Sequence, residues 1–317
     1  MHFIIQILNK HQLISATDEL ISFSLFIGTN RCYLVFTSRQ SKPIYAIKFM
    51  PVDTVKRVMA NTLELHQSMP NLIPKPVCTG LWGEDGYYIE KAIDRSMHFT
   101  LNENATNLNV SAFKDKCLNS LQLFSATVAI KTHWQVAINI QQELTQLWKR
   151  MANSSEFTLS SWRTEIDKII SLPTIQPVIE SHFQHGDFCL NNLIIQEDAV
   201  HCIDLEEFGD CSIPLYDEFS LAISFFNTFG NKKIEQLIDD INICISPKPN
   251  TSTIDALMLH KLLLFTLLYK IDKNHKYFSR RTHNQYLKNL LISYLENSDK
   301  FFLFHHSHSN LNTGPKE

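Results

Sequence analysis

A chain of 317 residues is long enough for two lobes with separate cores, and contents of 44% hydrophobic and 19% charged residues exclude a largely disordered protein. A net charge of −3, with no stretch dominated by lysine and arginine, excludes a general nucleic-acid binder. The seven cysteines are scattered without zinc-site spacing, which predicts free thiols in a reducing compartment.

Two apolar segments are the candidates for a membrane span, namely the start of the chain and residues 262–268. The first is too short to cross a bilayer and lacks the basic start and the cleavage site of a signal peptide. The second is a short run between Lys261 and Lys270, which is typical of a buried helix. We therefore expect a cytoplasmic protein with no membrane span, and the sequence leaves its oligomeric state open.

Residues 1–93 alternate short apolar runs with turns. Residues 31–36 and 44–49 predict a β-hairpin, and two further strands fit 77–82 and 87–90. Between these pairs, residues 54–67 predict a helix that the following prolines end. The sequence thus predicts a small β-rich lobe over residues 1–93 with one helix.

Beyond residue 94 the pattern is mainly helical. After a polar stretch over residues 95–109, three helices are expected between residues 111 and 172, the clearest over 136–151. A β-rich block over residues 181–203 precedes more helix. We expect an α+β protein with a larger, mainly helical lobe over residues 94–304 and a disordered tail over 305–317.

The strongest motif is the run HGDFCLNN at residues 185–192, followed by IDLE at 203–206. Phosphoryl transfer from ATP needs oxygen ligands for Mg²⁺ and a group that orients the acceptor hydroxyl and takes its proton. Asp187 on a loop can be that base. Asn192, five residues later, and Asp204, twelve residues further on, can hold the metal ion.

HGDFCLNN resembles the catalytic loop of the aminoglycoside phosphotransferase and choline kinase superfamily, and IDLE resembles its metal-binding motif. The resemblance implies a bilobal protein-kinase-like fold, ATP and Mg²⁺ as cofactors, Asp187 as the catalytic base, and Asn192 and Asp204 as Mg²⁺ ligands. The run PLYD at 214–217 is similar to a further family motif, which implies that Asp217 braces the catalytic loop. His185 is expected to hold the loop rather than act as a base.

The N-terminal half contains the groups that such a kinase needs for its nucleotide. Lys48 ends the strand-like run YAIK and resembles the lysine that holds the α/β-phosphates, with Glu64, sixteen residues on, as its expected ion-pair partner. The segment 28–31, including Asn30, resembles the loop that covers the phosphates. Adenine is expected to bind the backbone at Glu90 and Ala92, where the hinge between the lobes would lie.

Between residues 185 and 218 there are nine acidic residues and no lysine or arginine. Such a block needs neutralisation by cations, and Mg²⁺ supplies part of it. A cationic acceptor, such as a choline-, ethanolamine- or thiamine-like amino alcohol or an amino sugar, would supply more, with Glu206 as its candidate ligand.

The sequence therefore predicts an ATP-dependent kinase that phosphorylates a hydroxyl group of a small molecule. Two alternatives stay open. A nucleotide-binding pseudokinase scaffold is disfavoured because Asp187, Asn192 and Asp204 are all present. A Ser/Thr protein kinase is disfavoured because only twelve residues separate Asp204 from Asp217, which leaves no room for a long activation loop.

Overall fold

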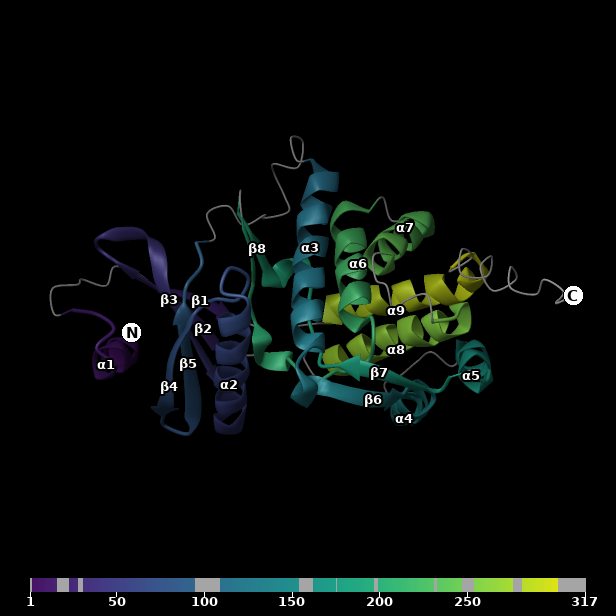
Figure 1. Cartoon of the computed structure of the whole chain (residues 1–317), viewed down its shortest axis with the longest axis horizontal. Helices are drawn as coiled ribbons and strands as arrows, with labels where there is room; N and C mark the ends of the chain where they lie inside the picture. Colours follow the sequence, from purple (N-terminus) through teal and green to yellow (C-terminus); the bar gives the residue numbers. More distant parts are fainter. Residues whose placement is uncertain are drawn as a thin grey trace, which may run out of the picture. The chain divides into compact units, whose positions relative to one another are not determined.

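Contacts divide the chain into two compact units (Figure 1). Unit 1 comprises Met1–Val128 and Asn191–Phe208, and unit 2 comprises Ala129–Leu190 and Gly209–Glu317. Asn30, most of the polar stretch after residue 94 and the tail over 305–317 lie outside the described residues. The computed structural model describes residues 2–15, 23–27, 31–94, 109–153, 162–174, 176–196, 199–230, 233–246, 254–275 and 281–301.

Unit 1 is built on an antiparallel five-stranded sheet with the strand order β1-β2-β3-β5-β4. The expected hairpin and the two further strands are present, together with one more strand at the edge. Successive side chains of a strand point to opposite faces, so β3 and β5 each present two different surfaces. The strands are β1 (Phe23–Ile27), β2 (Arg31–Thr37), β3 (Gln40–Met50), β4 (Pro76–Trp82) and β5 (Asp85–Lys91).

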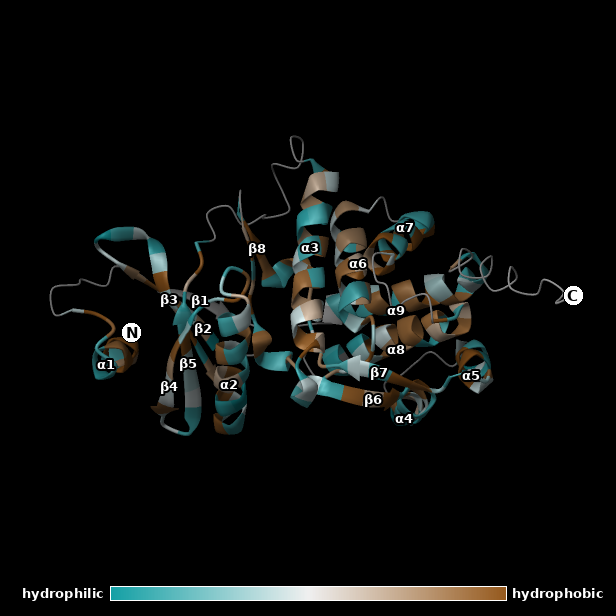
Figure 2. Ribbon diagram, in the orientation of Figure 1, coloured by the Kyte–Doolittle hydropathy of each residue, from teal (hydrophilic) through white to brown (hydrophobic). Residues whose placement is uncertain are grey.

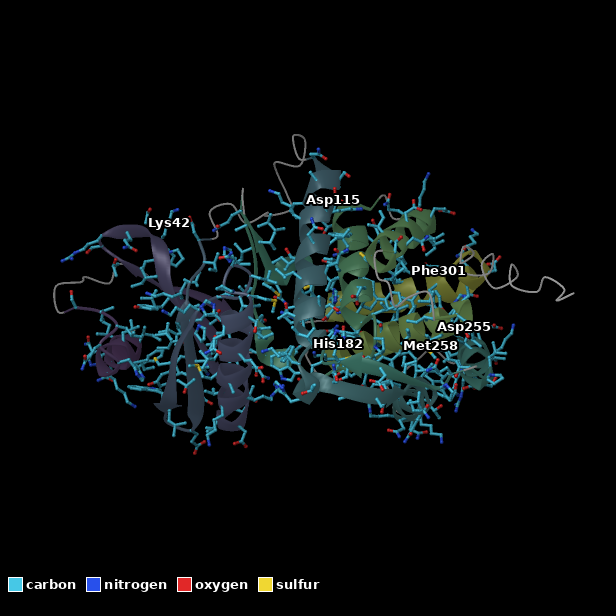
Figure 3. All side chains as sticks on the ribbon, in the orientation of Figure 1. Lys42, Asp115, His182, Asp255, Met258 and Phe301 are labelled. Carbon is cyan, nitrogen blue, oxygen red and sulfur yellow. The ribbon has the colours of Figure 1, made fainter. Side chains whose placement is uncertain are left out.

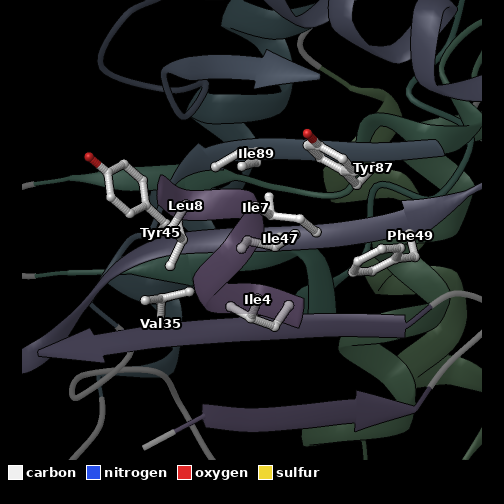
Figure 4. Close-up of a cluster of buried hydrophobic side chains, with 9 residues drawn as sticks. All are labelled: Ile4, Ile7, Leu8, Val35, Tyr45, Ile47, Phe49, Tyr87 and Ile89. Carbon is white, nitrogen blue, oxygen red and sulfur yellow. The ribbon is translucent and has the colours of Figure 1, made fainter. Parts of the chain in front are cut away.

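A helix at the start of the chain, α1 (His2–Lys10), covers one face of this sheet (Figure 4). Ile4, Ile7 and Leu8 lie one turn apart and pack on the apolar side chains of that face, among them Ile47. The prediction of a single helix in residues 1–93 is therefore wrong. Nine residues are too few for helical periodicity to stand out, and packing on the sheet supplies the stability that an isolated helix of this length lacks.

The expected helix α2 (Val52–Ser68) covers the other face, where Val55 and Val58 pack against Met50 and Tyr88. Three more elements complete the described part of unit 1. They are α3 (Val110–Ala129), which continues to the first residue of unit 2, and the two-stranded ladder of β8 (Leu193–Ile195) and β9 (Val200–Cys202).

Unit 2 combines a two-stranded sheet, β6 (Gln135–Asn139) with β7 (Val178–His182), and a set of helices. The start of the helix expected over residues 136–151 is wrong, because residues 135–139 form β6. The helix begins at Ile140, where the Asn139 side chain caps it by accepting a hydrogen bond from the Gln142 N–H at 3.0 Å. The helices are α4 (Ile140–Ala152), α5 (Arg163–Ser171), α6 (Tyr216–Phe229), α7 (Ile234–Ile245), α8 (Ala256–His275) and α9 (Arg281–Glu296).

Helix α8 lies at the centre of the unit 2 core, and Figure 2 shows hydrophobic residues along it. Every residue from Leu262 to Leu268 is buried, as the sequence predicts. Asp255 caps the helix by accepting a hydrogen bond from the Met258 N–H at 2.7 Å, and Figure 3 labels both residues. None of the helices in the described ranges is both long and apolar enough to cross a bilayer.

Candidate active site

In unit 1, Lys48 lies on the face of the sheet that α2 covers. On β3 the neighbouring residues Ile47 and Phe49 point to the α1 face, so the alternation turns Lys48 to the opposite side. The side chain is buried, with its Nζ 3.4 Å from Glu90 Oε1 and 3.6 Å from Asp204 Oδ1. The lysine and the carboxylate that the motifs assign to phosphate and metal are therefore neighbours in space.

The charge of Lys48 is held by the carboxylates around it. Burial by itself would lower the pKa of the Lys48 ammonium, because desolvation disfavours the charged form. Glu90, Asp204 and Glu206 outweigh that effect and raise the pKa well above its usual value. Lys48 is thus a fixed cation at any physiological pH, as a group that binds phosphate oxygens must be.

Asn192, directly before β8, and Asp204, shortly after β9, lie at the same end of the β8–β9 ladder. Beyond the pair Leu193–Cys202, the Ile203 N–H donates to the Asn192 carbonyl at 2.9 Å, which keeps the two chain segments together. Asp204 has a left-handed backbone with φ of 67°, and its side chain is 43% exposed. Aspartate tolerates this conformation better than most residues, and the turn leaves its carboxylate accessible.

This donor set fits Mg²⁺. Among the described residues, no group of three or more His, Cys, Asp or Glu side chains gathers as a complete metal cage. Mg²⁺ in phosphoryl-transfer sites does not need one, because it binds one or two protein oxygens together with substrate phosphates and water. Asn192 and Asp204 would be those protein ligands, and both carry the oxygen donors that a hard cation prefers.

Arg57 is a supporting residue that the sequence did not reveal. It lies on α2, and its guanidinium donates to the carbonyls of Glu206 and Phe208, each at 2.9 Å. The first carbonyl lies within the short 3-10 turn over Leu205–Glu207, which begins directly after Asp204, and the second lies directly after that turn. Two bonds from one rigid guanidinium therefore fix the turn next to the expected metal ligand. An exposed-looking helical arginine gives no sequence signal for this contact.

In unit 2, the loop after β7 presents Asp187. Gly186 has φ of 87°, a conformation that favours glycine and turns the chain sharply before the aspartate. His185 is fully buried, and its Nδ1 accepts a hydrogen bond from the Asp187 N–H at 3.3 Å, which makes its ring a brace for the loop. The Asp187 carboxylate itself is 37% exposed and so can be reached by a substrate.

Asp217 holds the same loop from the first turn of α6. Its buried carboxylate accepts hydrogen bonds from the backbone N–H groups of His185 at 2.6 Å and Gly186 at 3.2 Å. These are the backbone contacts that the PLYD motif leads us to expect. Burial and the neighbouring Glu218 raise the pKa of Asp217 to about 7, while the two N–H donors and Lys270 act in the opposite direction.

Lys270 on α8 is a cation beside Asp187 that the sequence did not reveal. Its Nζ lies 3.4 Å from Asp187 Oδ1 and 5.3 Å from the centre of the Tyr216 ring. The sequence placed Lys270 only as the flank of an apolar run, because nothing local links it to a loop 83 positions earlier.

The remaining predicted residues lie as follows. Glu64 is half-buried on α2, and its pairing with Lys48 stays a prediction, whereas Glu90 and Asp204 lie 3.4 and 3.6 Å from the lysine. The Ala92 N–H donates to the Ile44 carbonyl at 3.2 Å, so a bond from Ala92 to adenine would use its carbonyl. Glu206 acts electrostatically on Lys48, and its acceptor-binding role stays a prediction.

No protein-family model matches the sequence, and a comparison with curated proteins also finds no match. The fold, in contrast, matches solved structures. Macrolide 2'-phosphotransferase type I aligns with a TM-score of 0.58 at 12% identity, covering 92% of this chain and 96% of that chain. Choline kinase LicA from Streptococcus pneumoniae aligns with a TM-score of 0.53 at 15% identity, covering 93% and 100%.

This is the protein-kinase-like fold. An apo form of aminoglycoside phosphotransferase APH(4)-Ia, as a thermostable mutant, has it as well, with a TM-score of 0.56 at 13% identity over 86% of this chain and 94% of that chain. The fold that the HGDFCLNN and IDLE motifs imply, that of the aminoglycoside phosphotransferase and choline kinase superfamily, is thereby confirmed. By their names, these three neighbours are phosphotransferases or kinases.

Proposed function

We propose that the protein is an ATP-dependent phosphotransferase that moves the γ-phosphoryl group to a hydroxyl of a small molecule. In this reaction Lys48 binds the phosphates, and Asn192 and Asp204 bind Mg²⁺. Asp187 orients the acceptor hydroxyl and accepts its proton as the oxygen attacks phosphorus and the bond to the ADP oxygen breaks. Mg²⁺, when bound, neutralises charge on the transferring phosphate.

One observation carries the nucleotide side of this proposal, namely the distance of 3.6 Å between Lys48 Nζ and Asp204 Oδ1. In phosphoryl transfer the lysine and the metal ion act on oxygens of the same polyphosphate, so their protein groups must be neighbours. The two residues are 156 positions apart and belong to different motifs. A chance likeness of either motif would not bring their side chains together.

The acceptor side rests on the arrangement around Asp187. A general base must reach the proton that it takes and must keep a defined orientation. The 37% exposed carboxylate meets the first demand. The bonds from His185 and Gly186 to Asp217 meet the second, because they fix the backbone directly before the base.

A small molecule is favoured over a protein as the acceptor. The segment between Asp204 and Asp217 is tied down in unit 2, where Cys211 accepts from the Gln184 N–H and Gly209 donates to the Gln184 carbonyl, both at 3.0 Å. A further bond at 2.6 Å joins Ser181 to the Ser212 carbonyl. A segment held in this way lacks the length and freedom of a peptide-binding activation loop.

The finer parts of the proposal are the nucleotide, the metal and the compartment. Solved complexes of the neighbouring APH(4)-Ia hold ADP or AMP-PNP together with hygromycin B, which supports ATP as the phosphoryl donor. Oxygen donors at Asn192 and Asp204 support Mg²⁺. The seven cysteines, all within the described residues, form no disulfide, which supports a reducing compartment such as the cytoplasm.

The proposal is tested by ADP formation with a panel of alcohols, sugars and amino alcohols in the presence and absence of Mg²⁺. Asp187→Asn is the matched variant, since it keeps the size of the side chain and removes the base. We expect Mg²⁺-dependent turnover that falls by about 10³-fold in Asp187→Asn while Mg·ATP binding persists. Nucleotide binding without ADP formation from any of the alcohols, with or without Mg²⁺, would favour the pseudokinase alternative.

A further inference from the structure

Lys270 places a positive charge directly beside the proposed base. Its Nζ lies 3.4 Å from Asp187 Oδ1, and its side chain is only 11% exposed, so the charge is poorly screened by water. Both residues belong to unit 2, Lys270 on α8 and Asp187 on the loop after β7. A hydroxyl that hydrogen-bonds Asp187 must therefore approach this ammonium group as well.

The charged residues on α8 near Lys270, and those that hold the loop of Asp187, are of both signs. Lys273, one turn further along α8, is a second cation, and it acts with Lys270 on the buried Cys211 thiol. The Asp217 carboxylate accepts hydrogen bonds from the backbone of the loop, and the buried Glu218 raises the pKa of Asp217. Asp272, also on α8, forms an ion pair with Arg150 at 2.8 Å.

Lys270 also lies over the face of the Tyr216 ring. Lys270 Nζ lies 5.3 Å from the centre of that ring, which is fully buried. Proteins commonly bind quaternary ammonium groups over aromatic faces. At this ring the position over the face is occupied by the lysine, so an ammonium group of a substrate would meet repulsion there.

We propose that Lys270 determines the acceptor class by disfavouring alcohols that carry a positive charge next to the reacting hydroxyl, and that the acceptor is an uncharged or anionic alcohol. The inference rests on the proposed function, with Asp187 as the base. In a β-amino alcohol the ammonium group is two carbons from the reacting oxygen and would come within several ångströms of Lys270. At an effective dielectric constant of about 20, such a pair of like charges weakens binding by about 10²-fold.

This reverses the acceptor that the acidic block of residues 185–218 suggested. The block contains no lysine or arginine, but the fold brings cations to it from elsewhere in the chain. Lys48 lies beside Asp204 and Lys270 lies beside Asp187. A cationic substrate is therefore not needed to neutralise these carboxylates.

The test compares acceptors that differ in charge but not in shape. Choline is paired with its uncharged isostere 3,3-dimethylbutan-1-ol, and glucosamine is paired with glucose. ADP formation at saturating Mg·ATP gives kcat/KM for each alcohol with the wild-type protein, Lys270→Met and Lys270→Arg. Lys168→Met, at an exposed position of α5, is the control for the change in net charge.

For the wild type we expect the uncharged member of each pair to have the higher kcat/KM, by about tenfold to 10²-fold. Lys270→Met should reduce this ratio at least about tenfold, while Lys270→Arg and Lys168→Met should keep it within about threefold. The ratio is taken within each variant, so a loss of folded protein cancels.

A wild-type preference for the cationic alcohols, or an unchanged ratio in Lys270→Met, would overturn the inference and leave the proposed function intact. Mg·ATP binding without ADP formation from any of the four alcohols would instead count against the proposed function itself.

Discussion

The Asp217 carboxylate lies 2.6 Å from the backbone nitrogen of His185, and this hydrogen bond ties α6 to the loop that presents Asp187. A second bond, from the Gly186 N–H at 3.2 Å, makes the attachment two-pronged. Asp217 does not itself touch a reacting atom in the proposed reaction. Its effect on activity must therefore pass through the position of Asp187.

Asp217→Asn should reduce kcat because an amide has one acceptor oxygen where the carboxylate has two, and its NH₂ group would face a backbone donor. A small displacement of the base is expected to lower kcat by about 10²-fold. The affinity for Mg·ATP should stay within about threefold, because its proposed ligands belong to unit 1. Asp239→Asn, at an exposed position of α7, is the control and should leave kcat unchanged.

The raised pKa of Asp217 predicts a pH dependence of stability. With a folded-state pKa of about 7 against an ordinary value of 3.8, native Asp217 retains its proton at pH values where the unfolded chain has lost it. The stability from this group is complete below about pH 4 and is lost as the pH rises through about 7. The free energy of unfolding of the wild type relative to Asp217→Asn should thus fall by up to about 4 kcal/mol over this range. Urea denaturation at several pH values measures this difference, and a rise with pH would contradict the assignment.

Arg57→Ala should alter the position of Asp204 through the turn that follows it. Loss of two charged hydrogen bonds to the turn over Leu205–Glu207 should lower the free energy of unfolding by about 1.5–3 kcal/mol. It should also raise the Mg²⁺ concentration required for half-maximal activity, since the proposed ligand is no longer held. Arg57→Lys should not restore either property, because one ammonium cannot reproduce the two-pronged geometry.

The adjacent exposed residue provides the control for Arg57. Lys56→Ala removes the same charge from the same helix and should leave the Mg²⁺ requirement and the stability unchanged. A wild-type Mg²⁺ requirement in Arg57→Ala would show that the turn does not depend on this guanidinium.

Lys48 and Glu90 form a buried ion pair. A double-mutant cycle can separate the contribution of this pair to stability from the proposed role of Lys48 in phosphate binding. Lys48→Met leaves the Glu90 carboxylate buried without this cation, which should lower the free energy of unfolding by about 3–5 kcal/mol. Adding Glu90→Gln should restore part of that stability but not Mg·ATP binding, which calorimetric titration would report. Restored nucleotide binding in the double variant would contradict the phosphate-binding role of Lys48.

The raised pKa of Lys48 also fixes the pH window of this pair. Stabilisation by a lysine with a raised pKa is complete below its ordinary value of about 10.4 and is lost only as the pH rises through the folded-state value. The destabilisation caused by Lys48→Met should therefore be constant between about pH 6 and pH 9. A steep change within this window would contradict the charged pair.

The motif residues could be predicted from the sequence because their relationships are local. Asp187 and Asn192 lie in one run of eight residues, and Asp204 follows soon after the β8–β9 ladder, so their spacing alone carries the pattern. The partners that hold them could not be predicted in this way. Arg57 bonds the turn after Asp204, and Lys270 lies beside Asp187, each from a helix far away in the sequence. Each looks like an ordinary charged residue of its helix.

The same distinction between local patterns and distant contacts explains which elements of the fold could be predicted. The hairpin of β2 and β3 and helix α2 have strong local periodicity, and the structure has them with small shifts at their ends. Helix α1 has only nine residues and depends on packing against the sheet. Strand β6 precedes α4 without a break, and only the Asn139 cap marks where the helix starts.

The most direct test of the account follows a radiolabelled γ-phosphoryl group from ATP into the small-molecule fraction of a metabolite extract. With the wild-type protein and Mg²⁺, we expect label to move to a small molecule, and with Asp187→Asn we expect transfer to fall by about 10³-fold. Label that stays on ATP with the wild type, or that appears on protein instead, would contradict small-molecule phosphoryl transfer by this chain.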